Sequence, residues 1–186
     1  MKKQQNSLLL ALRLTAVVAV TTLLLAVVNA VTAPVIAERV RREGMQAREA
    51  LIPGSAALLS SPELSEAEAK TVGDIYRITR DDAVQGYCVD ISVNGFGGTI
   101  SMIVAVSVDR NILGVKILSH SETPGIGSKA VEEDGALLAA LKDIPVRGVH
   151  SVEGISGATV SSKAILSGVL TATQVVERLE QERGGA

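Results

Sequence analysis

A threonine hydroxyl lies at the predicted start of the last helix of this 186-residue chain. Thr159 directly follows three small residues, Ser156, Gly157 and Ala158. A helix N-terminus has unpaired backbone N–H groups and about half a positive charge, so it favours a phosphate. Glycine and alanine leave room for a bulky group to approach the backbone. The same residues are also typical of an ordinary helix start, in which a nearby serine caps the helix.

Three segments resemble one family of flavin carriers. Residues 153–159, Glu-Gly-Ile-Ser-Gly-Ala-Thr, are similar to the Asp-x-x-Ser/Thr-Gly-Ala-Thr signature of proteins that carry FMN on the final threonine. Residues 120–129, His-Ser-Glu-Thr-Pro-Gly-Ile-Gly-Ser-Lys, resemble the His-x-Glu-Thr-Pro-Gly-Leu-Gly segment of the same FMN-binding domain. Residues 95–98, Gly-Phe-Gly-Gly, match the glycine-rich start of a strand in that family. The order fits the G subunit of Rnf/Rsx-type electron transport complexes, with the C subunit of sodium-pumping NADH:quinone reductase as the alternative.

The resemblance implies a covalent FMN, joined by a phosphoester bond to the oxygen of Thr159. A separate flavin transferase that uses FAD would make this bond, with Ser161 and Ser162 as additional phosphate donors. Two residues depart from the family pattern: Glu153 replaces the usual aspartate and Ile126 replaces the usual leucine. The second change conserves volume, and neither removes the hydroxyl that the attachment needs.

The resemblance also places a second group of residues near the flavin ring and ribityl chain. This group consists of Glu122, Thr123, Gly125, Gly127 and Lys129. A lysine charge near the ring would favour the anionic reduced flavin, although an ordinary solvated lysine is an equal interpretation. Phe96 is the best aromatic candidate for contact with the ring, and a core role is its alternative.

The function that the resemblance implies is electron relay. FMN accepts one electron at a time and holds two, so it can link iron–sulfur centres to other flavins. The chain would serve in a membrane complex that moves electrons between ferredoxin and NAD(H), coupled to Na⁺ or H⁺ transport. Iron–sulfur and flavin subunits would be its partners, and it would not be catalytic alone. The alternatives are a structural subunit of the same fold without flavin and, less favoured, an FMN-binding sensor.

An uncharged apolar run extends from Leu14 to Ala37. At about 1.5 Å per residue it spans roughly 36 Å, enough to cross the hydrocarbon core of a bilayer. We predict a retained transmembrane helix, with a cleavable signal peptide as the alternative because Val28-Asn29-Ala30 resembles a cleavage site. Basic residues flank the run on both sides, so charge does not decide its orientation. The resemblance implies the inner membrane, with the C-terminal domain on the periplasmic side.

The amino-acid composition argues against nucleic-acid binding and against a metal site. Three of the 18 basic residues precede residue 38, which leaves 15 basic and 20 acidic residues beyond it, a net charge of −5. An acidic domain without a basic cluster argues against nucleic-acid binding. Cys88 is the only cysteine and is predicted to be a buried strand residue. With only His120 and His150 besides, a metal site has few ligands available.

The remaining pattern predicts an α+β fold, in which helices pack on a mainly antiparallel sheet. Strands are expected at residues 75–78, 87–93, 99–108 and 112–118, which are rich in branched residues and joined by short turns. The apolar run 102–106 indicates a central strand covered on both faces. A loop is expected at 55–61, and helices at 135–142 and 160–183. The expected organisation is a tail (1–13), a transmembrane helix (14–37), a juxtamembrane helix and linker (38–62) and an FMN-binding domain (63–186).

Overall fold

The computed structural model describes residues 2–59, 64–66 and 68–184. The chain divides into two compact units, residues 1–42 and residues 43–186. Helix α1 (Lys2–Leu51) supplies the described part of the first unit and continues into the second, with Pro34 inside it.

Helix α1 has the composition of a membrane span. Within the described residues it is the one helix long and apolar enough to cross a bilayer, with a mean hydropathy of 2.3 in its most apolar window. A helix suits lipid because its backbone groups bond to one another. The hydroxyls of Thr15 and Thr21 follow the same rule, since they donate to the carbonyls of Ala11 and Val17 at 3.0 and 3.1 Å. The predicted apolar N-terminal helix is therefore confirmed.

The second unit is built on a six-stranded sheet in the order β1-β2-β3-β4-β5-β6. Each neighbouring pair of strands is antiparallel, which confirms the predicted fold class. The strands are β1 (Ser55–Leu58), β2 (Val72–Arg80), β3 (Ala83–Asn94), β4 (Thr99–Ser107), β5 (Asn111–His120) and β6 (Ile144–Pro145). The prediction of a loop at residues 55–58 was wrong, because these residues pair with 76–79 of β2 and form the edge of the sheet.

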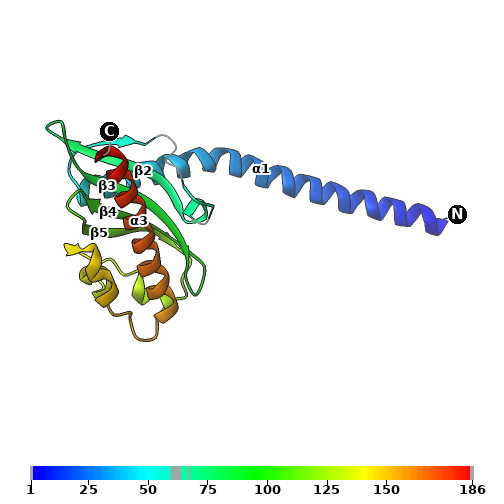
Figure 1. Ribbon diagram of the computed structural model, residues 1–186. Helices are drawn as coiled ribbons and strands as arrows, with labels where there is room; N and C mark the ends of the chain where they lie inside the picture. The colour runs from blue at the N-terminus through cyan, green and yellow to red at the C-terminus, as the bar shows by residue number, and fades with distance from the viewer. Residues whose placement is uncertain (1, 60–63, 67, 185–186) are drawn as a thin grey trace. The chain divides into compact units, whose positions relative to one another are not determined.

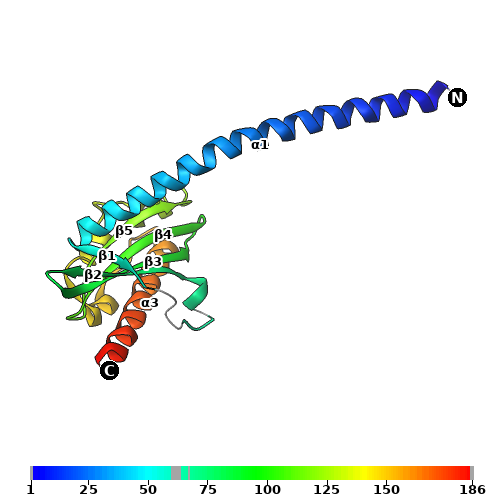
Figure 2. The same ribbon diagram turned by 90° about the horizontal axis from the view of Figure 1, so that it is seen from above.

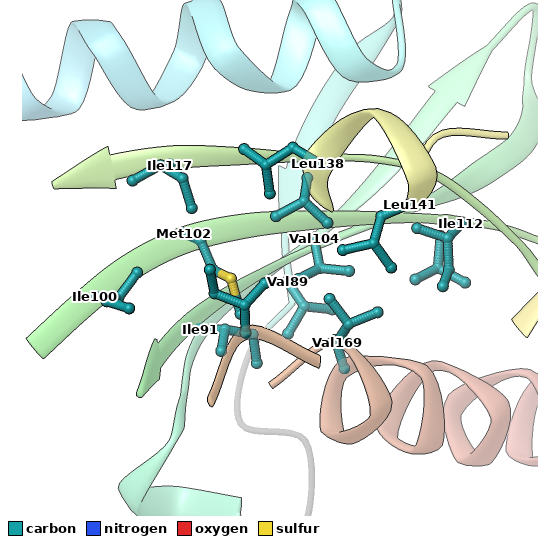
Figure 3. Close-up of a cluster of buried hydrophobic side chains, with 14 of the residues drawn as sticks. Val89, Ile91, Ile100, Met102, Val104, Ile112, Ile117, Leu138, Leu141 and Val169 are labelled. Atoms are coloured by element: carbon teal, nitrogen blue, oxygen red, sulfur yellow. The ribbon is translucent and has the colours of Figure 1, made fainter. Parts of the chain in front are cut away.

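Helix α3 (Thr159–Gly184) packs on one face of the sheet (Figure 1). The core beneath it includes Met102 and Val104 of β4 and Val169 of α3, all fully buried (Figure 3). Side chains along a strand alternate between faces, so Ile103 and Ala105 point to the opposite side. There they pack with Ala47 and other residues near the end of α1, within the same compact unit. The end of α1 and helix α3 thus cover opposite faces (Figure 2), as predicted for a central strand.

Short helical segments lie beyond β5 and complete the first core. They are the 3₁₀ helices η2 (Gly127–Ala130) and η3 (Val146–Ser151) and the short helix α2 (Ala136–Ala140). Leu138 and Leu141 from this region enter the core beside β5 (Figure 3). The segment η2 contacts α3, and it brings the end of β5 toward the helix. A further 3₁₀ turn, η1 (Glu68–Lys70), precedes β2.

Candidate functional site

A tight turn precedes the first residue of α3. The N–H of Ala158 donates to the carbonyl of Ile155 at 3.0 Å, and Gly157 has a φ of +80°. A positive φ at the third residue is the signature of a type II turn, and glycine adopts it without strain. A side chain at position 157 would meet nothing within 4 Å, so backbone conformation is the reason for glycine here. The turn leaves both Ser156 and Thr159 exposed.

The start of α3 is open. Thr159 is the first helical residue, and the first helical hydrogen bond runs from the N–H of Ser162 to the carbonyl of Ala158 at 2.9 Å. The N–H groups of residues 159–161 precede that bond and have no partner within the helix. Ala158 occupies the cap position, and its methyl group cannot accept a hydrogen bond. Replacing a capping side chain by alanine generally costs about 0.5–2 kcal/mol, so the sequence gives up stability at this position.

Ser161 and Ser162 face inward and hold the neighbouring loops. Both residues are fully buried. The oxygen of Ser161 accepts the N–H of Phe96 at 3.4 Å, and the oxygen of Ser162 accepts the N–H of Ile155 at 3.0 Å. Ser161 therefore connects the glycine-rich loop to the start of α3, and Ser162 closes the turn ahead of Thr159. Their predicted role as phosphate donors remains a prediction.

A second turn of the same kind follows β5. The N–H of Ile126 donates to the carbonyl of Thr123 at 3.2 Å, and Gly125 has a φ of +78°. Pro124 presets the preceding position of the turn. The oxygen of Ser128 accepts the N–H of Gly125 at 2.8 Å, which fixes the turn to the start of η2. Thr123, Gly125 and Lys129 are exposed, whereas Gly127 is buried.

Glu122 joins the glycine-rich loop to this second turn. Its carboxylate oxygen Oε2 accepts the N–H of Gly97 at 3.1 Å, and its own N–H donates to Nδ1 of His120 at 3.3 Å. Side chains at positions 95 and 127 would collide with the two carboxylate oxygens. These two glycines therefore allow the loop and the turn to enclose the carboxylate. The burial of Glu122 could not be read from the sequence, because an isolated glutamate beside a turn is normally solvated.

Large apolar side chains are exposed at three positions around these contacts. Phe96 is 59% exposed, Val160 is 53% exposed and Ile126 is 44% exposed. Phe96 is held to α3 by Ser161, and Val160 directly precedes that serine. Ile126 directly precedes Gly127, where an added Cβ would lie 2.7 Å from the Ser161 oxygen. The three side chains thus come from three segments that meet at Ser161. The prediction that Phe96 is available for contact with a ring agrees with its exposure.

The residues gathered here fit a phosphorylated flat ring. The open end of α3 offers backbone donors and positive potential to a phosphate. The exposed hydroxyl of Thr159 lies at that end. The exposed apolar side chains suit the body of an aromatic ring. Among the described residues, oxygen Oε1 of Glu122 is buried and has no hydrogen-bond partner. These features are the ones that FMN attached to Thr159 would need.

Cys88 lies outside this region. It is fully buried in β3, as predicted, and burial raises the pKa of its thiol to about 12. A thiol with so high a pKa is almost entirely protonated at neutral pH and is a poor nucleophile. Redox chemistry at this side chain is therefore disfavoured by its position.

Comparison with known proteins finds a family match that covers this region. The model of the FMN-binding domain family matches residues 95–174, which include the glycine-rich loop, the second turn and the start of α3. Residues 95–174 of this chain therefore match the FMN-binding domain family.

Relatives found by sequence include G subunits of ion-translocating complexes. The G subunit of the Na⁺-translocating ferredoxin:NAD⁺ oxidoreductase complex of Acetobacterium woodii is 28% identical over 92% of each chain. The G subunit of the proton-translocating ferredoxin:NAD⁺ oxidoreductase complex of Clostridium ljungdahlii is 30% identical over 55% of this chain and 60% of its own length. The G subunit of an ion-translocating oxidoreductase complex of Cereibacter sphaeroides is 44% identical over 30% of this chain and 25% of its own. The expected resemblance to G subunits is confirmed.

Proposed function

We propose that this protein is a membrane-anchored flavoprotein subunit that relays electrons through FMN bound covalently to Thr159. The observation that carries the proposal is the exposed Thr159 hydroxyl at the uncapped N-terminus of a 26-residue helix. The phosphate would accept the N–H groups that Ala158 cannot cap. The ring would pack on the exposed apolar side chains of Phe96, Ile126 and Val160.

The attachment is a phosphoryl transfer to Thr159. Its oxygen forms a bond to the phosphorus on the riboflavin side of FAD, and the phosphoanhydride bond of FAD breaks. AMP leaves, and the hydroxyl proton passes to the transferase or to water. This chain contributes the acceptor hydroxyl and an open turn, while a separate flavin transferase supplies the FAD and the catalysis.

The tether offsets a weak noncovalent site. An exposed apolar surface with three side chains would bind a flavin weakly, and a cofactor at about micromolar affinity, roughly 8 kcal/mol, exchanges with its surroundings. A covalent link makes each rebinding intramolecular, at an effective concentration on the order of millimolar. This advantage is greatest outside the cytoplasm, where lost FMN would not be replaced readily.

The relatives and the apolar helix α1 support a proposal for the complex and its location. Two relatives are named for ferredoxin:NAD⁺ oxidoreductase complexes that translocate Na⁺ or protons. We infer a place in a complex of this kind, beside iron–sulfur and flavin subunits, with α1 anchored in the inner membrane. The domain that begins near residue 43 would lie on the periplasmic side. The run from Leu14 to Ala37 has no ionisable residue, so ion movement would take place in other subunits.

Replacing Thr159 with alanine should abolish covalent flavin. The full chain is produced together with a flavin transferase, denatured and examined by in-gel flavin fluorescence. The wild type should give a fluorescent band, and Thr159→Ala should give none because its side chain has no acceptor oxygen. Mass mapping of the peptide that contains Thr159 should show the added mass of one FMN less one water.

Two control variants distinguish the loss of the acceptor hydroxyl from a general effect of substitution on folding. Thr159→Ser retains a hydroxyl and should still carry flavin, at the same or lower yield. Thr171→Ala removes another hydroxyl of α3, which donates to the carbonyl of Ser167 at 3.0 Å, and should leave the fluorescence unchanged. Undiminished fluorescence in Thr159→Ala would contradict the proposed attachment.

A further inference from the structure

Strand β5 has an edge that its neighbour covers only in part. β5 has ten residues, whereas β6 has two and pairs only with Asn111 and Ile112. Beyond Ile112, no strand of the described residues pairs with the side of β5 that faces away from β4. Alternate residues of an antiparallel strand direct their N–H and C=O groups to opposite sides, so part of the backbone of residues 113–118 faces this edge. An uncovered edge of this kind is a template for a further strand.

A pocket of about 380 Å³ borders the uncovered edge. It is lined by residues 116–118 of β5, by residues between 43 and 50 at the end of α1, and by Glu133. The end of α1 lies over β5 (Figure 2), and a Cβ at Gly114 would lie 2.9 Å from Cδ2 of Leu51. The pocket belongs to one compact unit of the chain, and it provides space for a side chain beside the strand.

The lysine on this edge is already paired. Edge strands commonly carry a lysine whose charge discourages pairing with another chain. Here the ammonium of Lys116 lies 2.6 Å from the carboxylate of Glu133, so a charge of opposite sign offsets its own. Glu43 also lines the pocket, and it has no ion pair among the described residues. The pocket therefore combines a net negative charge with apolar side chains such as Ala47 and Leu118.

We propose that this edge of β5 binds an extended segment of a partner polypeptide, which adds a strand to the sheet and directs a lysine or arginine side chain into the pocket. In this mode of recognition, backbone hydrogen bonds provide affinity and side-chain pockets provide specificity. A long basic side chain fits this pocket, because its apolar stem contacts the apolar side chains while its charged end reaches a carboxylate. The segment belongs to another subunit of the membrane complex, so this inference rests on the proposed membership of that complex but not on the flavin.

Hydrogen exchange tests the strand addition. The full chain is purified from its own membranes in two forms, within its complex and alone in detergent. The amides of residues 113–118 that do not bond to β4 should exchange at least about tenfold more slowly in the complex, because each gains a backbone hydrogen bond. The amides of β1, at the opposite edge of the sheet, are the control and should exchange at similar rates in both forms. Equal exchange of residues 113–118 in the two forms would overturn the proposal.

Photo-crosslinking identifies the occupant of the pocket. Gln46 lines the pocket and is exposed, so a benzophenone amino acid in its place reports on what lies there. Irradiation of membranes that contain the full chain should give a cross-link to a lysine- or arginine-containing segment of another subunit, as mapped by mass spectrometry. Cross-links only to lipid or to a second copy of this chain would overturn the proposal.

Charge reversal tests the basic side chain. The double variant Glu43→Lys/Glu133→Lys makes the pocket positive and should lower the yield of the cross-link at least about tenfold, because like charges repel at an interface. The control Glu66→Lys/Glu182→Lys reverses two exposed carboxylates elsewhere and should leave the yield unchanged. An undiminished cross-link in the first double variant would overturn the basic side chain. If that variant does not enter the complex, the exchange measured on the wild type still decides on the added strand.

The outcomes separate this inference from the proposed function. A wild-type chain without covalent flavin would overturn the attachment to Thr159 and leave the added strand standing. Attached flavin together with unprotected amides at residues 113–118 would overturn the added strand alone. A chain that purifies from its membranes with no other subunit would overturn the proposed complex and the strand addition together.

Discussion

Glu68 is the acidic residue whose contacts most clearly link stability to pH. Its Oε2 accepts the hydroxyl of Ser65 at 2.7 Å and the N–H of Ser65 at 2.8 Å. The N–H of Glu68 donates back to the Ser65 oxygen at 3.3 Å, which completes a capping box. Arg178 of α3 donates to both carboxylate oxygens at 3.2 Å. The Ser65 hydroxyl, the Ser65 N–H and Arg178 together lower the pKa of Glu68 to about 2.

This lowered pKa predicts a loss of stability in acid. The ordinary pKa is 4.5, so between that value and about 2 the unfolded chain binds a proton that the folded chain does not. The contribution of Glu68 is therefore complete above about pH 4.5 and is lost as the pH falls toward 2. Glu68→Gln should lower the free energy of unfolding at pH 7 by about 1 kcal/mol, a value reduced for solvent screening. Urea unfolding at pH 7 and pH 3 measures the difference.

Glu66→Gln is the matched control for this prediction. Glu66 is exposed two residues earlier, and its replacement should change the unfolding free energy little at either pH. The Glu68→Gln defect should be smaller at pH 3 than at pH 7. A defect of equal size at both pH values would show that charge on Glu68 contributes nothing.

At the scale of single residues, the sequence predicted the exposed groups better than the buried ones. The position of Thr159 after a glycine turn follows from local rules, because glycine at a positive φ and the start of a helix are both local properties. The inward direction of Ser161 depends on a bond to the segment 95–98, which is distant in the sequence. The inward direction of Ser162 depends on a bond to residue 155, which lies in a loop. The burial of Glu122 depends in the same way on two glycines from different segments. Contacts of this kind are set by tertiary packing and leave no local signal.

At the scale of elements, the sequence predicts helix α3 and strands β2–β5 but not strands β1 and β6. Branched residues and short turns identify β2–β5 from the sequence alone. The segment Ser-Ala-Ala-Leu of β1 lacks β-branched and aromatic residues, so its local preference for a strand is weak. Its pairing with residues 76–79 decides the outcome. Strand β1 is thus an example of tertiary context overriding propensity.

Gly168 determines how closely α3 approaches the sheet. A Cβ at this position would lie 2.5 Å from Cε of Met102, 2.8 Å from Cγ2 of Ile91 and 3.0 Å from Cγ1 of Val93. In an exposed helix, replacing glycine with alanine would stabilise by about 1 kcal/mol. Here the branched side chains of Ile91 and Val93 cannot rotate away from an added Cβ as the flexible end of the Met102 side chain can. The clash should therefore outweigh the helix propensity.

We expect Gly168→Ala to destabilise the domain by about 1–3 kcal/mol, the usual cost of overpacking a core. Thermal unfolding measures the change. Ser167→Ala, at the neighbouring exposed position of the same helix, should leave the unfolding temperature nearly unchanged. A more stable Gly168→Ala variant would show that α3 can move away from the sheet at no cost.

At the scale of the whole domain, the sheet needs cover on both faces. Helix α3 covers one face, and residues near the end of α1 cover the other. Arg48 anchors this second cover through bonds of 2.8 and 2.6 Å to the carboxylate of Asp90, and its guanidinium lies 3.8 Å from the centre of the Tyr76 ring. Burial raises the pKa of Asp90 in spite of the nearby arginine. The ion pair therefore fixes the end of α1 on the sheet more than it adds to the free energy of unfolding, because both charges lose their hydration on burial.

The compact unit that begins at Glu43 should therefore fold without the apolar part of α1, provided that the end of the helix is kept. A fragment of residues 43–186 should show one cooperative thermal transition.

A fragment of residues 53–186 loses Ala47, Arg48 and Ile52 and exposes Ile78 and Ile103, which are buried in the same cluster. Each exposed isoleucine costs about 1.5–3 kcal/mol, and a typical domain has only about 5–15 kcal/mol of stability. The shorter fragment should thus unfold at a much lower temperature or aggregate. Arg48→Met in the longer fragment should fall between the two, since it leaves Asp90 without its partner but keeps the apolar cover. Equal unfolding temperatures for the two fragments would show that the end of α1 contributes no stability to the sheet.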